Sequence, residues 1–70
     1  MHYKRIKELR EENELTQEQV AQILGCKREV YRRYEAGERE IPISCAVKLA
    51  QHYQVSVDYL VGLTDMKKSW

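Results

Sequence analysis

Two short amphipathic segments joined by a tight turn dominate the hydrophobic pattern of residues 15–37. The first segment places its apolar residues on one helical face: Val20, Ile23 and Leu24. Thr16 with Gln19 three positions later has the spacing of a capping box, which predicts that a helix begins there. Gly25 follows the last apolar residue and suits the left-handed conformation that ends many helices. The pattern therefore predicts two helices separated by two or three residues.

The second segment, about residues 27–36, has two faces of opposite character. At ~100° per residue, the core side is formed by Val30, Tyr31 and Tyr34. The opposite side carries charged residues: Arg28, Glu29, Arg32 and Arg33. Such a face often serves only to solvate a helix. Here, however, cations predominate on the second helix of a tight pair, which is the helix that enters the DNA major groove in a helix-turn-helix.

At these residues the chain resembles the lambda-repressor-like helix-turn-helix family, also called the Cro/repressor or Xre family. The resemblance covers the first helix (residues 6–10), the second helix (15–25), the recognition helix with its exit loop (27–40) and two closing helices (41–65). It implies an all-α, compact fold of five short helices around one small core. We expect a single domain over the 70 residues with the helix-turn-helix at about positions 16–36.

The resemblance also implies site residues. Its base-reading positions match Arg28, Glu29 and Arg33. Contacts to the DNA backbone are expected from Gln17, Lys27, Arg32 and Arg39. Glu29 has two interpretations, because a carboxylate facing DNA is repelled unless it accepts from a cytosine amino group or is neutralised by Arg33 in the same helix. Finally, the resemblance implies a structural ion pair between Arg10 and Glu35.

Two residues depart from the family pattern. Lys27 stands where the family prefers serine or threonine, so we expect the recognition helix to lack a side-chain cap. Tyr31 replaces the customary aliphatic residue in the core, and its hydroxyl group needs a hydrogen-bond partner or an outlet to solvent. Neither departure changes the predicted fold.

The remaining apolar pattern predicts the other helices. The first helix has a stripe made of Tyr3, Ile6 and Leu9. Pro42 suits the start of a later helix and Ser44 its cap. The core face of that helix is predicted to contain Ala46, Val47, Leu49, Ala50 and Tyr53. Ser56 is predicted to cap a last short helix, which Gly62 ends.

The composition shows that charge must be segregated along the chain. Twelve Lys and Arg against eleven Asp and Glu give a net charge of +1, far from the strongly basic balance of a nonspecific nucleic-acid coat. Acidic residues concentrate in the first helix and the residues after it: Glu8, Glu11, Glu12, Glu14 and Glu18. With the basic recognition helix, this distribution suits one face toward DNA and one face away from it.

Several classes of protein are disfavoured. No apolar run approaches the ~20 residues of a membrane span, and residues 1–10 lack the apolar stretch of a signal peptide, so we expect a cytoplasmic protein with no membrane partner. Cys26 and Cys45 have no metal-ligand spacing to His2 or His52, and we expect both to be packing residues. No catalytic arrangement, phosphate loop or small-molecule site is evident. The sequence predicts a non-enzyme without metal or cofactor.

Two functional hypotheses remain. The first is sequence-specific binding of a double-stranded DNA operator by a transcriptional repressor or regulator. The alternative is an antitoxin or anti-repressor type of module, in which the same fold holds another protein. A homodimer, at least on DNA, is expected through apolar residues of the last helix and tail: Val57, Tyr59, Leu63, Met66 and Trp70. The tail, residues 64–70, has an equal alternative as a flexible, frayed terminus.

Overall fold

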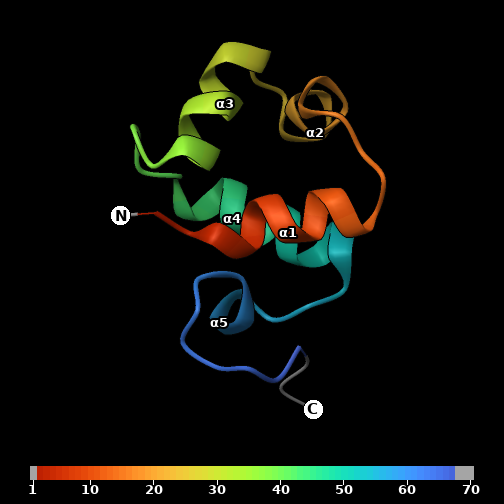
Figure 1. Cartoon of the computed structure of the whole chain (residues 1–70), viewed down its shortest axis with the longest axis vertical. Helices are drawn as coiled ribbons and strands as arrows, with labels where there is room; N and C mark the ends of the chain where they lie inside the picture. Colours follow the sequence, from red (N-terminus) through yellow and green to blue (C-terminus); the bar gives the residue numbers. More distant parts are fainter. Residues whose placement is uncertain (1, 68–70) are drawn as a thin grey trace.

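The computed structural model describes residues 2–67 and folds them into five helices without a strand (Figure 1). The helices are α1 (Lys4–Glu12), α2 (Gln17–Leu24), α3 (Arg28–Ala36), α4 (Ile43–Tyr53) and α5 (Val57–Leu60). Figure 1 shows α2 and α3 at one end of the long axis and α5 at the other, with α1 and α4 between them. The predicted all-α fold of five short helices is confirmed.

Local hydrogen bonds define the helix ends that the sequence predicted. The Thr16 hydroxyl accepts from the Gln19 N–H at 3.1 Å, and the Gln19 side chain accepts from the Thr16 N–H at 2.8 Å. This reciprocal pair is a complete capping box at the start of α2. Gly25 ends α2 with a φ of 74°. At α5, the Ser56 hydroxyl accepts from the Tyr59 N–H at 3.0 Å, so three of the predicted end signals are confirmed.

Two predictions about α4 were wrong. Ser44 does not cap the helix, because Pro42 occupies the N-cap position and its carbonyl accepts from the N–H groups of Cys45 and Ala46, both at 3.0 Å. The buried face of α4 is formed by Ala46, Leu49 and Ala50. Val47 lies ~100° around the helix from Ala46 and is 37% exposed rather than buried.

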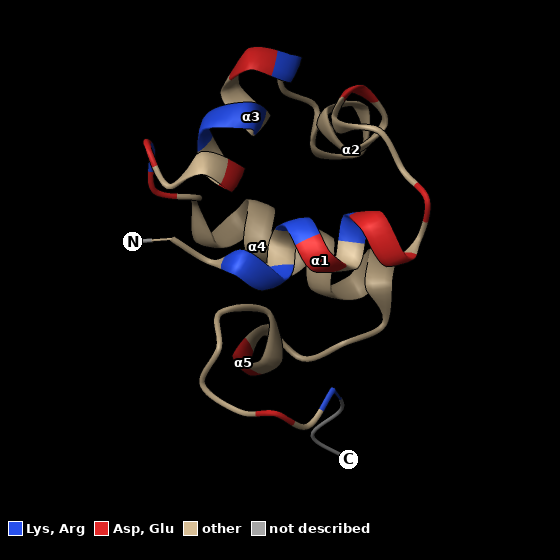
Figure 2. Cartoon of the chain, in the orientation of Figure 1, with Lys and Arg blue, Asp and Glu red and all other residues tan. Residues whose placement is uncertain are grey.

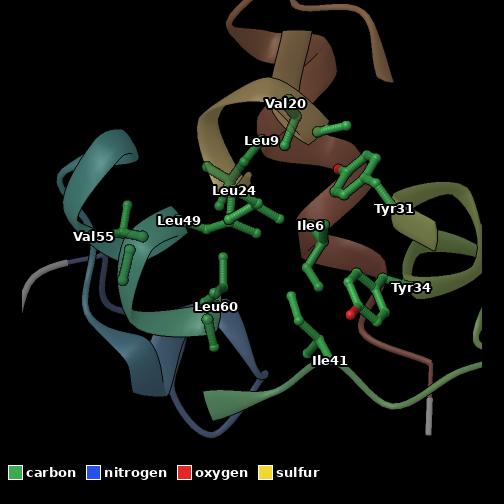
Figure 3. Packing of buried hydrophobic residues seen from close by; sticks show 13 residues of the cluster. Ile6, Leu9, Val20, Leu24, Tyr31, Tyr34, Ile41, Leu49, Val55 and Leu60 are labelled. Carbon is green, nitrogen blue, oxygen red and sulfur yellow. The ribbon is translucent and has the colours of Figure 1, made fainter. Parts of the chain in front are cut away.

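Side chains from all five helices meet in one core (Figure 3). Its buried residues are Ile6, Leu9, Val20, Ala21, Leu24, Tyr31, Tyr34, Ile41, Ala46, Leu49, Ala50, Val55 and Leu60. In Figure 3, Tyr31 and Tyr34 extend from α3 toward Ile6 of α1. Because successive turns of α3 are anchored by these rings, the opposite face of the helix is directed to solvent.

Arg5 of α1 joins the segment after α5 to the rest of the molecule. Its guanidinium donates to the carbonyl of Tyr59 at 2.8 Å, to the carbonyl of Thr64, and to the Asp65 carboxylate at 2.5 Å. The guanidinium carbon also lies 4.1 Å from the centroid of the Tyr59 ring, within the range of a cation–π contact. These contacts place the residues after α5 against α1.

The residues predicted for a dimer interface differ in exposure. Leu63 and Met66 are 77% and 67% exposed. Val57 and Tyr59 are half-buried and pack against the core. Trp70 lies outside the described residues. The dimer and the flexibility of the tail therefore stay predictions, with Leu63 and Met66 available to a second copy.

Candidate nucleic-acid interface

A short corner, residues 25–27, joins α2 to α3. The Cys26 N–H donates to the Ala21 carbonyl at 3.0 Å, so the chain turns directly against the end of α2. Lys27 is the N-cap residue of α3 and its side chain makes no capping hydrogen bond. This absence was predicted, because lysine replaces the serine or threonine that the family prefers there. Glu29 lies in the first turn of α3, where a carboxylate interacts favourably with the helix dipole.

The face of α3 opposite the core carries the residues predicted to read bases. Arg28 and Glu29 are exposed, and the side chains of Arg32 and Arg33 are 39% and 49% exposed. Figure 2 shows basic bands on α3, with an acidic band in its first turn. The helix thus has the predicted division into an aromatic core face and a charged outer face.

The residues predicted to contact the DNA backbone surround this outer face. Gln17 is the first residue of α2 and is half-buried. Lys27 directly precedes α3, and Arg39 lies in the loop after it; both are exposed. Arg32 lies on α3 itself. The structure therefore places these polar groups before, on and after the recognition helix, and their roles as backbone contacts stay predictions.

Carboxylates neutralise part of the outer face. Arg32 Nη2 lies 2.8 Å from Glu29 Oε1 and 3.4 Å from Glu38 Oε1. Arg33 Nε is 3.6 Å from Glu29 Oε1. The predicted intrahelical pair of Glu29 with Arg33 is present, but Arg32 is the closer partner. The hydrogen bond from Arg32 is the main reason why the pKa of Glu29 lies below its usual value.

Glu35 forms the centre of a hydrogen-bond network that joins α1, α2 and α3. Its Oε2 accepts from Arg10 Nε at 2.6 Å and from the Tyr31 hydroxyl, and its Oε1 accepts from Arg10 Nη2 at 3.3 Å and from Gln17 Nε2 at 3.2 Å. Arg10 Nη1 also donates to the Leu15 carbonyl at 2.9 Å. The Arg10 and Glu35 side chains are only 14% and 5% exposed, so the pair is placed as the resemblance implied.

The same network provides the partner that the Tyr31 hydroxyl required. Tyr31 has no exposed surface, and burial, followed by its hydrogen bond to Glu35, raises its pKa. Burial alone would raise the pKa of Glu35, but the hydrogen bonds from Arg10, Tyr31 and Gln17 together outweigh it and lower that pKa. Glu35 is therefore an ionised, buried acceptor that fixes the recognition helix against its neighbours.

The Gln17 side chain makes a hydrogen bond to Glu35 that the sequence did not predict. One N–H of its side-chain amide is directed at Glu35 at 3.2 Å. An amide nitrogen carries two hydrogens, so the second remains for another acceptor. The buried carboxylate therefore orients the side chain that begins α2. The spacing of Gln17 and Glu35 in the chain contains no signal for this contact.

One group of acidic residues lies away from α3 (Figure 2). In the picture they cluster at the C-terminal end of α1 and in the loop that leads to α2. Exposed members of this group are Glu11, Glu12 and Glu14. The segregation of charge expected from the composition is therefore only partial, because Glu29 and Glu38 pair with Arg32 at the outer face of α3.

No group of three or more His, Cys, Asp and Glu side chains within residues 2–67 is placed to hold a metal ion. Cys26 and Cys45 are free thiols that pack, half-buried, against the core, as predicted. None of the helices in the described part of the chain has the length and apolar character needed to cross a membrane.

Comparison with known proteins agrees with this geometry. The family model described as helix-turn-helix matches residues 6–60, a range that runs from α1 to the end of α5. The chain belongs to the helix-turn-helix family. The resemblance noted from the corner and the recognition helix is thereby confirmed. No solved structure gives a significant match to this helix-turn-helix chain.

Curated relatives have similar sequences over most of the chain. The uncharacterized HTH-type transcriptional regulator YobD of Bacillus subtilis is 43% identical over 65 residues, which are 93% of this chain and 58% of YobD. The phage CTXphi transcriptional repressor RstR of Vibrio cholerae is 36% identical over 62 residues, 89% of this chain and 56% of RstR. The uncharacterized HTH-type transcriptional regulator YqaE of B. subtilis is 34% identical over 61 residues, 87% of this chain and 53% of YqaE. The helix-turn-helix chain thus spans a little over half the length of these relatives.

Proposed function

We propose that the protein binds double-stranded DNA in a sequence-specific manner and regulates transcription, with α3 in the major groove. One observation carries the proposal: Tyr31, Tyr34 and Glu35 fix one face of α3 inside the domain, so the opposite, arginine-bearing face is presented to solvent. A rigid helix with a basic outer face suits the major groove, whose width admits an α-helix. The relatives named as transcriptional regulators support the same function.

The position of each side chain suggests its role. Arg28 and Arg33 are the residues proposed to grip guanine, since a guanidinium can donate to both acceptors on the major-groove edge of that base. Glu29 has the same orientation, but it is engaged by Arg32 and Arg33. Backbone contacts are proposed for Gln17, Lys27, Arg32 and Arg39, which set the register of the protein on DNA without reading sequence.

We favour a specific form of this function. The protein would be a non-enzymatic repressor that acts as a homodimer in the cytoplasm. Two-fold symmetry would set the two recognition helices about one DNA turn, roughly 34 Å, apart and make the operator a near-palindrome. The exposed Leu63 and Met66 support a contact through the residues after α5. The name of RstR as a repressor supports repression over activation.

The decisive experiment is selection of a binding site from randomised duplexes, followed by titration of variants on the selected duplex. The test variant replaces Arg28, Arg32 and Arg33 by Ala. The control replaces Lys4 and Lys48 by Ala, which removes positive charge from helices other than α3. A base-reading arginine contributes about 1–3 kcal/mol to specific binding, so the test variant should bind about 30-fold or more weakly than the parent.

The control variant should bind within a few-fold of the parent, and circular dichroism should show both variants folded. If the folded triple-arginine variant binds the selected duplex as tightly as the parent, the proposal of a DNA reader is wrong. In that case the antitoxin or anti-repressor type of module becomes the better hypothesis. The exposed apolar side chains Ile43, Leu63 and Met66 are the observation that favours this second candidate.

A further inference from the structure

Arg32 is held by carboxylates from two different parts of the chain. Its Nε lies 3.1 Å and its Nη2 lies 2.8 Å from Glu29 Oε1. Its Nη1 and Nη2 lie 3.5 and 3.4 Å from the two carboxylate oxygens of Glu38. All three guanidinium nitrogens of Arg32 therefore donate to carboxylates. Arg28, in contrast, has no ion pair within residues 2–67.

The end of α3 brings Glu38 into this position. Gly37 adopts a left-handed conformation with a φ of 75°, which reverses the chain at the helix terminus. The Glu38 N–H then donates to the Arg33 carbonyl at 3.0 Å, so residue 38 lies beside the last turns of the helix. A Cβ atom at position 37 would lie 3.1 Å from the Cβ of His2, which further favours glycine at this turn.

Carboxylates and DNA phosphates compete for the same donors. The N–H groups of Arg32 that bond Glu29 and Glu38 are the groups that a phosphate oxygen would accept from. A new contact to phosphate must therefore replace existing contacts, and Glu38 would be brought toward the DNA as an unpaired negative charge. The free energy that Arg32 contributes to DNA binding is therefore reduced by the free energy needed to break its contacts with these carboxylates.

We propose that Glu38 is an affinity-determining residue of the DNA-binding face, which holds Arg32 and thereby masks its contribution to DNA binding. This inference rests on the proposed function and adds a residue outside the recognition helix to it. The effect does not depend on base sequence, because phosphate contacts carry no sequence information. Glu38 therefore sets how tightly all DNA is bound, while Arg28 and Arg33 set which DNA is bound.

The test is a double-mutant cycle of Glu38→Gln and Arg32→Ala, measured by titration at one fixed salt concentration. Each of the four proteins is titrated against the selected duplex and against a scrambled duplex. Glu18→Gln is the matched control: Glu18 is exposed and lies in the first turn of α2, in the helix-turn-helix itself, without contact to Arg32. Circular dichroism establishes that each protein is folded.

Exposed ion pairs have modest strength, so we expect Glu38→Gln to tighten binding to both duplexes by about two- to fivefold. The same substitution in the Arg32→Ala background should change affinity no more than Glu18→Gln does in the parent. Equivalently, Arg32→Ala should weaken binding more in the Glu38→Gln background than in the parent. The coupling between the two positions, rather than the tightening alone, is the result that supports masking.

Two results would overturn the inference. One is an affinity for DNA that Glu38→Gln leaves unchanged. The other is an equal tightening with and without Arg32, which would mean that Glu38 only repels phosphate. Failure of the proposed function gives a different result, because the triple-arginine variant would then bind duplex as tightly as the parent does.

Discussion

Arg10→Ala tests whether the ion pair between α1 and α3 stabilises the fold. The pair is bidentate, with Arg10 to Glu35 distances of 2.6 and 3.3 Å, and its side chains are 14% and 5% exposed. Removing one partner of a buried pair costs about 3–5 kcal/mol, whereas an exposed pair contributes about 0–1 kcal/mol. Because Arg10 keeps some contact with solvent, and Tyr31 and Gln17 still donate to Glu35, we expect a loss of about 1–3 kcal/mol.

The pH dependence of this loss has a defined sign. In the parent, the pKa of Glu35 is lowered. A carboxyl group of this kind stabilises the fold above its unfolded-state pKa, and the contribution is lost as the pH falls through the lower, folded-state pKa. In Arg10→Ala, burial is opposed by fewer hydrogen bonds, so the pKa of Glu35 rises and the buried carboxyl takes up a proton more readily. The stability difference between parent and variant should therefore shrink as the pH is lowered from about 7 to about 4, which is below the ordinary pKa of glutamate of about 4.3.

Urea unfolding followed by circular dichroism at these two pH values measures both effects. Arg33→Ala is the control, since the Arg33 side chain is 49% exposed and its removal should change the free energy of unfolding by less than about 0.5 kcal/mol. A double-mutant cycle with Glu35→Gln isolates the pair. A coupling below about 0.3 kcal/mol would remove the structural role assigned to it. A loss that does not change with pH would refute the argument from ionisation of Glu35.

Two further predictions concern the proposed function. Arg28→Ala or Arg33→Ala should weaken operator binding by about 1–3 kcal/mol and relax the preference at one base pair. Arg32→Ala should instead weaken binding to every sequence alike and lower the salt slope by up to about one unit. Titrations at several salt concentrations distinguish the two patterns, and identical patterns for the three variants would contradict the assignment. For the dimer, sedimentation with DNA should show two protein copies on a near-palindromic site, and a monomer both free and on DNA with a single half-site footprint would count against it.

Helix ends were predictable where the signal is local. Thr16 and Gln19 form their capping box within a single turn, and Gly25 needs only its own conformational freedom to end α2. Ser44 misled the prediction because Pro42 starts the helix two residues earlier and places serine inside the first turn. The exposure of Val47 was missed because the helical period places a boundary residue at each edge of the core face of α4. Tertiary packing, which periodicity does not describe, decides which of these boundary residues is buried.

Contacts between distant segments were predictable only through resemblance or not at all. The pair of Arg10 and Glu35 came from the family pattern, because no spacing rule joins residues on separate helices. The contacts of Arg5 with the segment after α5 carry no periodic signal. Glu38 was missed for a different reason: residues six apart do not meet on a regular helix, and only the left-handed turn at Gly37 brings Glu38 beside Arg32.

The two faces of α3 make stability and DNA binding separable by mutation. Tyr31 and Glu35 lie on the inner face, and Glu35 also orients Gln17 at the start of α2. A Glu35 variant would therefore lose stability and displace a proposed backbone contact together, so its loss of binding would say nothing specific about DNA. Arg28 and Arg33 project from the opposite face, where substitution leaves the core intact. Within α3, a variant that loses affinity without losing stability thus identifies a residue of the outer face, and Arg28 and Arg33 are the positions where we expect that result.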